Sequence, residues 1–110
     1  MKSMKGMSIL VTGGGSGIGT DCARRFCQEG ARVTISGRRL AKLEAVQAEL
    51  GEHCHIIQGD VTAQGDRERM VAAAVTHGGG KLDALVNNAA NMYRQPVDGY
   101  TEAFLQDAFN

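Results

Sequence analysis

The stretch that decides the fold is Ser8-Ile-Leu-Val-Thr-Gly-Gly-Gly-Ser-Gly-Ile-Gly19, in which the apolar run Ile9 to Val11 leads into five glycines within seven residues. This pattern predicts a buried strand, a tight loop and the start of a helix. The first turn of such a helix has unpaired backbone N–H groups and the positive end of the helix dipole, which together favour a phosphate. Glycine leaves the approach open because it has no side chain.

The spacing of these glycines separates the loop from two related phosphate-binding motifs. The pattern G-x-G-x-x-G fails because its third glycine falls on Ile18 or Thr20, and the pattern G-x-x-x-x-G-K-[ST] fails because no lysine follows. Gly13, Gly17 and Gly19 instead follow the spacing G-x-x-x-G-x-G. For this motif alone, a glycine turn that only joins a core strand to a helix remains an alternative.

Strand and helix patterns alternate along the rest of the chain. The first helix has apolar residues at helical spacing, Ile18, Cys22 and Phe26, which predicts that this stripe faces the core. The later strands are too apolar to face water on either side, which favours a parallel sheet between helices. The patterns predict strands at 31–36, 54–58 and 82–86, and helices at 39–50, 66–77 and from Thr101 onward.

This alternation predicts an α/β fold, the first half of a Rossmann-type doubly wound parallel sheet. Right-handed crossovers give the strand order 3-2-1-4. Ligands of such sheets bind beyond the carboxyl ends of the strands where the order reverses, here beside residues 13–19 and 87–90. We therefore expect residues 1–110 to form one nucleotide-binding domain that is incomplete at its C-terminus.

Composition excludes several classes of protein. Twelve basic and twelve acidic residues cancel, so we expect neither nucleic acid nor a membrane surface as a partner. Cys22, Cys27 and Cys54 form no disulfide pattern, and no apolar run is long enough for a signal peptide or a membrane span, which favours a cytoplasmic protein. His53 and His55 alternate with Cys54 across a predicted strand, so we expect no metal site there.

Four motifs, in their order and spacing, resemble those of the short-chain dehydrogenase/reductase family over nearly the whole chain. They are Thr12-Gly-Gly-Gly-Ser-Gly-Ile-Gly19, Arg38-Arg39, Asp60-Val61 and Asn87-Asn-Ala-Ala90. The resemblance implies a nicotinamide cofactor and hydride transfer between that cofactor and a carbonyl or alcohol substrate. Backbone N–H groups of the loop and the Ser16 hydroxyl would surround the pyrophosphate; the loop residues implied are Gly13, Gly15, Ser16, Gly17, Ile18 and Gly19.

The residues after the second strand predict which cofactor is preferred. Sheets that bind NAD need an acidic residue there, which accepts a hydrogen bond from the ribose hydroxyl, whereas the 2′-phosphate of NADP needs positive charge. Ser36-Gly-Arg-Arg39 contains no acid, so we expect NADP(H), with Arg38 as the main partner of the phosphate and Arg39 beside it. NAD(H) stays open as a second cofactor, and two solvated arginines are the alternative.

The remaining cofactor residues follow from the resemblance. Asp60 matches the acid that meets the adenine edge and Val61 the residue that lines the ring, although a surface carboxylate is the alternative for Asp60. Asn87 and Ala89 belong to the motif that seats the adenosine side. The family usually has glycine where this chain has Ala90. This difference leaves open how the loop lies at the adenosine end of the cofactor.

The catalytic residues that the resemblance implies are mostly absent. Asn110 matches an asparagine that holds a water in the proton relay, with a frayed terminal residue as the alternative. Tyr93 and Tyr100 are followed four residues later by valine and phenylalanine instead of lysine. We therefore expect the oxidoreductase to be a longer protein and this chain alone to be inactive; the alternative is a truncated, non-catalytic dinucleotide-binding or regulatory protein. We also expect homo-oligomers, since the last strand would leave an open sheet edge.

Overall fold

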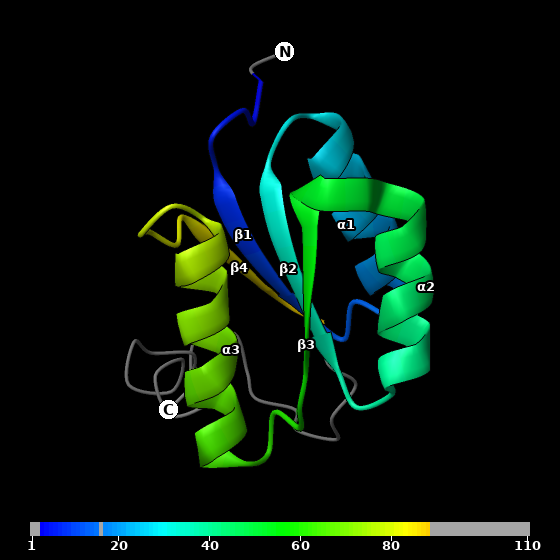
Figure 1. Ribbon diagram of the computed structural model, residues 1–110, viewed down its shortest axis with the longest axis vertical. Coiled ribbons are helices and arrows are strands. Elements are labelled where there is room, and N and C mark those ends of the chain that lie inside the picture. The colour runs from blue at the N-terminus through cyan, green and yellow to red at the C-terminus, as the bar shows by residue number, and fades with distance from the viewer. Residues whose placement is uncertain (1–2, 16, 89–110) are drawn as a thin grey trace, which may run out of the picture.

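The computed structural model describes residues 3–15 and 17–88, in which strands and helices alternate (Figure 1). The four strands form one parallel sheet in the order β3-β2-β1-β4, as predicted. The helix predicted from Thr101 lies outside the described residues. The elements are β1 (Ser8–Thr12), α1 (Gly17–Gln28), β2 (Arg32–Gly37), α2 (Leu40–Leu50), the short 3-10 helix η1 (Gly51–His53), β3 (Cys54–Gln58), α3 (Gln64–His77) and β4 (Ala84–Asn87).

The sheet has helices on both faces, which explains why apolar side chains point to both sides of its central strand β1. Strand β3 differs from the sequence-based expectation, because His55 and Gln58 at its edge of the sheet are exposed. Figure 1 shows α1 and α2 on one side of the sheet and α3 on the other. Side chains alternate along β1, so Ile9 and Val11 join the core under α1 and α2 whereas Leu10 packs with Met70 and Ala74 of α3. Every residue of β1 is buried. Because all four strands are parallel, their carboxyl ends lie at the same edge of the sheet, as in doubly wound sheets.

The face that α1 turns to the sheet differs from the predicted stripe. Ile18 is 70% exposed, whereas Ala23 is fully buried, and Phe26 and Cys27 pack partly against the core. The buried side is centred on the small residues Gly19 and Ala23, which let the helix backbone approach the sheet. Of the predicted stripe, Phe26 packs against the core and Ile18 does not, because the close helix contact selects small side chains as well as apolar ones.

The position of His53 differs from the one predicted from sequence. His53 lies in η1 and not in the strand, and its ring Nδ1 is 3.2 Å from the Ala31 carbonyl oxygen. The His55 ring stacks on His77 with 5.2 Å between ring centroids. Among the described residues, no three His, Cys, Asp or Glu side chains come together in a way that could hold a metal ion.

No helix in residues 3–15 and 17–88 is both long and apolar enough to cross a membrane.

The start of β4 is held against β1 by a pair of hydrogen bonds between Ser8 and Asp83. The Ser8 N–H donates to Asp83 Oδ2 (2.8 Å) and the Asp83 N–H donates to the Ser8 carbonyl oxygen (2.8 Å). Lys81 Nζ lies 2.9 Å from the same carboxylate oxygen. The Ser8 N–H and the Lys81 ammonium lower the pKa of Asp83, because both stabilise its ionised form. This carboxylate thus fixes where β4 joins the sheet.

We predict that acid weakens the fold partly through Asp83. Since its pKa is lowered in the folded state, its stabilisation is complete above the ordinary value of 3.8 and is lost as the pH falls from there toward the folded value. Asp83→Asn should therefore make the free energy of unfolding less dependent on pH in acid, measured by urea unfolding across a pH series. Glu44→Gln is the control, because the Glu44 side chain is exposed and makes no hydrogen bond or ion pair within the described residues. An unchanged acid dependence in Asp83→Asn would contradict the prediction.

Candidate functional site

The glycine loop leaves the carboxyl end of β1 and packs closely on β2. Gly13 has a φ of +70°, a conformation that L side chains rarely adopt, so the chain turns sharply there. The Gly14 N–H donates to the Ser36 carbonyl oxygen (3.0 Å), and a Cβ on Gly14 would lie 2.5 Å from the Ile35 Cβ. The loop is therefore fixed to the end of β2, the strand that immediately precedes the arginine pair.

The start of α1 combines a crowded glycine with an open one. A Cβ on Gly19 would overlap the Gly13 carbonyl oxygen and lie 2.7 Å from Asn88 Nδ2, whereas a Cβ on Gly17 would meet nothing within 4 Å. Gly19 thus allows the helix to meet the loop, and Gly17, with a φ of +57°, keeps the backbone at the helix start accessible. Unpaired N–H groups in this first turn are suited to an anion.

A polar network joins the ends of β1 and β4 to the loop. The buried Thr12 hydroxyl donates to Asn87 Oδ1 (2.9 Å) and accepts from the Asn88 N–H (3.1 Å). Asn88 Nδ2 in turn donates to the Gly13 carbonyl oxygen (3.5 Å). The asparagine motif and the glycine loop, which were expected to border the same crevice, are thus in direct contact. Sequence reasoning gave Thr12 and Asn88 no role of their own, although both stand inside the quoted motifs.

The arginine pair lies at the exposed tip between β2 and α2. Both Arg38 and Arg39 are exposed, Arg39 is the N-cap residue of α2, and the first turn of α2 contains no acidic residue. The Gln58 amide donates to the Arg38 carbonyl oxygen (3.0 Å), which ties this tip to the end of β3. The two guanidinium groups are therefore next to the site edge and open to an incoming anion.

Asp60 is held in a defined position just after β3. Its Oδ1 accepts from the Thr62 N–H (2.9 Å) and the Thr62 hydroxyl (2.7 Å), while its own N–H donates to Asp66 Oδ2 (2.8 Å). The two Thr62 bonds lower the pKa of Asp60, and the charge of Arg38 adds to the effect. Its Oδ2 has no hydrogen-bond partner in the described part of the chain, so it is available to accept from a ligand. Val61 beside it is partly buried against the α3 side of the core.

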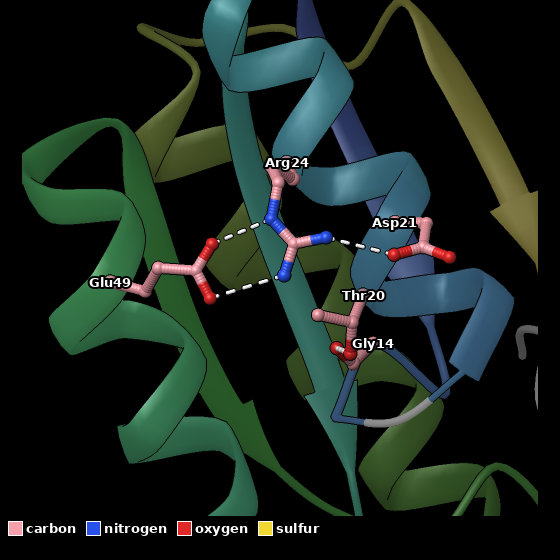
Figure 2. A network of polar contacts seen from close by, with 5 residues as sticks. All are labelled: Gly14, Thr20, Asp21, Arg24 and Glu49. Carbon is pink, nitrogen blue, oxygen red and sulfur yellow. Dashed lines mark hydrogen bonds and ion pairs between the residues drawn. The ribbon is translucent and has the colours of Figure 1, made fainter.

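The opposite side of the loop contacts α1 and α2 (Figure 2). The Thr20 hydroxyl donates to the Gly14 carbonyl oxygen (2.9 Å), and one turn further along α1 the Arg24 guanidinium joins the two helices. Its Nε and one terminal nitrogen donate to the two carboxylate oxygens of Glu49 (2.6 and 3.1 Å), and the other terminal nitrogen donates to Asp21 (2.8 Å). These bonds raise the pKa of Arg24 and lower that of Glu49.

The structure thus brings most of the predicted cofactor residues to one edge of the sheet. The loop, the arginine tip, Asp60 with Val61, and Asn87 all lie at or just beyond the carboxyl ends of the strands. Ser16, Ala89 and Asn110 lie outside the described residues. Free backbone N–H groups, two cations and a fixed carboxylate form a surface suited to a ligand that carries phosphates and a hydrogen-bond donor.

Comparison with known proteins agrees with this geometry. Residues 7–110 match the family model described as short chain dehydrogenase. The chain is 39% identical over 101 residues to "Oxidoreductase asL5" of Sarocladium schorii, which covers 92% of this chain and 40% of that protein. It is 38% identical over 89 residues to the 3-phenylpropionate-dihydrodiol/cinnamic acid-dihydrodiol dehydrogenase of Escherichia coli K12 / DH10B, which covers 81% of this chain and 33% of that protein.

Solved structures give the same family. A 3-ketoacyl-(acyl-carrier-protein) reductase from Brucella melitensis, solved with NADH, aligns with a TM-score of 0.76 and 32% identity over 96% of this chain and 43% of its own. A short chain dehydrogenase from Bacillus anthracis aligns with a TM-score of 0.75 and 33% identity over 97% of this chain and 44% of its own. The chain therefore spans between 33% and 44% of the length of these relatives. Its match from residue 7 to residue 110, joined to the strand order and the glycine loop, shows that the chain belongs to the short-chain dehydrogenase family.

Proposed function

We propose that this chain binds NADP(H) as the dinucleotide-binding part of an oxidoreductase that transfers hydride between the cofactor and a carbonyl or alcohol substrate. The family of the chain supports the oxidoreductase reaction. The preference for NADP(H) is a more specific claim that needs its own support. The relative from Brucella melitensis was solved with NADH, which supports a nicotinamide dinucleotide in general. When bound, the nicotinamide ring would supply the hydride chemistry, and the fold would supply its position.

The observation that carries the preference is the charge at the tip of β2. A 2′-phosphate needs a cation where NAD-binding sheets have a carboxylate. Arg38 and Arg39 are exposed there, with no acid in the first turn of the helix that follows. Asp60 is close enough to Arg38 to feel its charge but is fixed by Thr62, which leaves the Arg38 guanidinium free to move to a phosphate.

The loop and the strand ends supply the rest of the proposed site. Gly17 keeps the start of α1 open, so that backbone N–H groups there can bind the pyrophosphate. Asp60 Oδ2 would accept from the adenine amino group, and Val61 would contact the ring. Asn87, held by Thr12, would bind the adenosine side. Ser16, Ala89 and Asn110 keep the roles that the sequence resemblance implies.

We further propose a cytoplasmic protein that forms homo-oligomers. Cys22, Cys27 and Cys54 are free thiols, and burial together with nearby Cys27 raises the pKa of Cys54 to about 12, as suits an inert thiol in a reducing compartment. Within the described residues, β4 pairs only with β1, so its other edge is available for a further strand.

The proposal predicts that NADPH raises the melting temperature of the chain more than NADH at equal concentration. A ligand that binds only the folded state stabilises it by mass action, by about 2.7 kcal/mol at a hundred times its Kd. Differential scanning fluorimetry with an external dye measures this for NADPH, NADH and a buffer control. No shift with either dinucleotide would overturn the proposed function, and an equal or larger shift with NADH would overturn the NADP(H) preference alone. In the longer protein, loss of NADPH absorbance with a panel of carbonyl compounds tests hydride transfer against a binding-only role.

A further inference from the structure

We propose that Lys42 is a third cation of the 2′-phosphate site and that it binds this phosphate from the α2 side of the glycine loop. This inference rests on the proposed function, because it names a residue that selects NADP(H) over NAD(H). Sequence reasoning did not single out Lys42, since nothing in its local pattern distinguishes it from any exposed lysine of a helix.

The first support is contact between Lys42 and the loop. The Lys42 Cβ lies 3.3 Å from the position that a Cβ on Gly15 would occupy, so the stem of the lysine begins directly against the loop backbone. Gly15 and Lys42 share a surface hollow of about 270 Å³ between α1 and α2. The hollow has room for more than one water, since one water needs roughly 10–15 Å³ of such space. The residues around the hollow are Gly15, Thr20, Lys42, Ala45, Val46 and Glu49.

The second support is the charge balance of this hollow. Glu49 supplies the one carboxylate among these lining residues. This carboxylate already accepts hydrogen bonds from Nε and a terminal nitrogen of Arg24 (2.6 and 3.1 Å). Figure 2 shows that the Arg24 guanidinium lies between Glu49 and Asp21, so the acids on this side are neutralised by a partner other than the lysine. The Lys42 backbone N–H donates to the Arg39 carbonyl oxygen (3.2 Å), but its exposed side chain makes no hydrogen bond or ion pair within the described residues. This side chain, whose Cβ lies against the loop, is therefore available to a ligand.

The third support is the division of roles between Lys42 and Arg38. Arg38 has an acidic neighbour, since its charge helps to lower the pKa of Asp60. Lys42 stands in the first turn of α2, on the side that faces Gly15, and its side chain pairs with no acidic group within the described residues. A flexible ammonium can follow a phosphate that the planar guanidinium binds from another direction. Lys42 on one side and the arginine pair on the other would hold the phosphate more selectively than the arginine pair alone.

The experiment compares two probes that differ only in the 2′-phosphate. Calorimetric titration of the full chain with 2′,5′-ADP and with 5′-AMP gives both affinities for wild type, Lys42→Ala, Lys42→Arg and Arg38→Ala. We expect Lys42→Ala to lower the affinity for 2′,5′-ADP by about tenfold, which is the effect of losing one charge-assisted contact. The affinity for 5′-AMP should not change. Lys42→Arg should restore most of the loss. Lys5→Ala is the matched control, because it removes the same charge from an exposed lysine near Gly30, at the other end of α1.

Each contrary result has a separate meaning. If Lys42→Ala binds 2′,5′-ADP like wild type while Arg38→Ala does not, the assignment of Lys42 is wrong and the proposed function stands. An equal loss for both probes would mean that Lys42 shapes the loop without meeting the 2′-phosphate, which also overturns the assignment. If the wild-type chain binds neither probe nor NADPH, the proposed function fails and the inference with it.

Discussion

Gly19→Ala is expected to lower the free energy of unfolding by about 1–3 kcal/mol, the usual cost of forcing an extra carbon into a packed site, and to weaken dinucleotide binding at the same time. The new Cβ would overlap the Gly13 carbonyl oxygen and crowd Asn88 Nδ2. A backbone carbonyl cannot turn aside like the end of a side chain, so the loop itself must move. Urea unfolding measures the first effect, and titration with NADPH measures the second.

Gly65→Ala is the matched control for this prediction. Gly65 lies in the first turn of α3, and a Cβ there would meet nothing within 4 Å. Alanine favours a helix over glycine by about 1 kcal/mol, so the control should be as stable as wild type or more stable and should bind NADPH normally. If Gly19→Ala behaved like Gly65→Ala, the close packing of α1 against the loop would be wrong.

The sheet was predictable from sequence because its signals are local. Apolar runs such as Ile9 to Val11 end in glycines, and each is followed by a helical spacing of apolar residues. Once strands and helices alternate, the handedness of crossovers leaves few strand orders, and the observed order β3-β2-β1-β4 is the predicted one. Boundaries moved by a few residues at most, as with β4, which runs over Ala84–Asn87.

The buried side of α1 and the contacts of the glycine loop could not be predicted from local sequence patterns. Ile18 is exposed because the contact that matters is made by Gly19 and Ala23, whose small size shows only once α1 is placed on the sheet. The bond from Asn88 Nδ2 to the Gly13 carbonyl oxygen and the contact of Lys42 with Gly15 join segments that are distant in sequence. Such contacts carry no periodic signal, although the Thr12 and Asn88 positions already stood inside recognised motifs.

Arg38→Asp is expected to lower the affinity for NADPH by roughly a hundredfold, equivalent to about 3 kcal/mol. The change removes a charge-assisted bond to the 2′-phosphate and brings a carboxylate toward it, so loss and repulsion act together. The introduced carboxylate can accept from a free ribose hydroxyl, and the affinity for NADH should therefore rise. Titration of wild type and variant with both dinucleotides measures the change in preference.

Stability separates this effect from damage to the fold. Arg38 is exposed and its side chain makes no hydrogen bond within the described residues, so Arg38→Asp should unfold at nearly the urea concentration of wild type. Lys5→Asp makes the same change of net charge near Gly30, at the other end of α1 from the loop, and should leave both affinities unchanged. Because the two variants carry the same total charge, a loss of NADPH binding in Arg38→Asp alone must come from the position of the charge. Equal NADPH affinity in both variants would instead leave the arginines as solvated surface residues, and the charge that selects the cofactor would have to lie elsewhere along the loop.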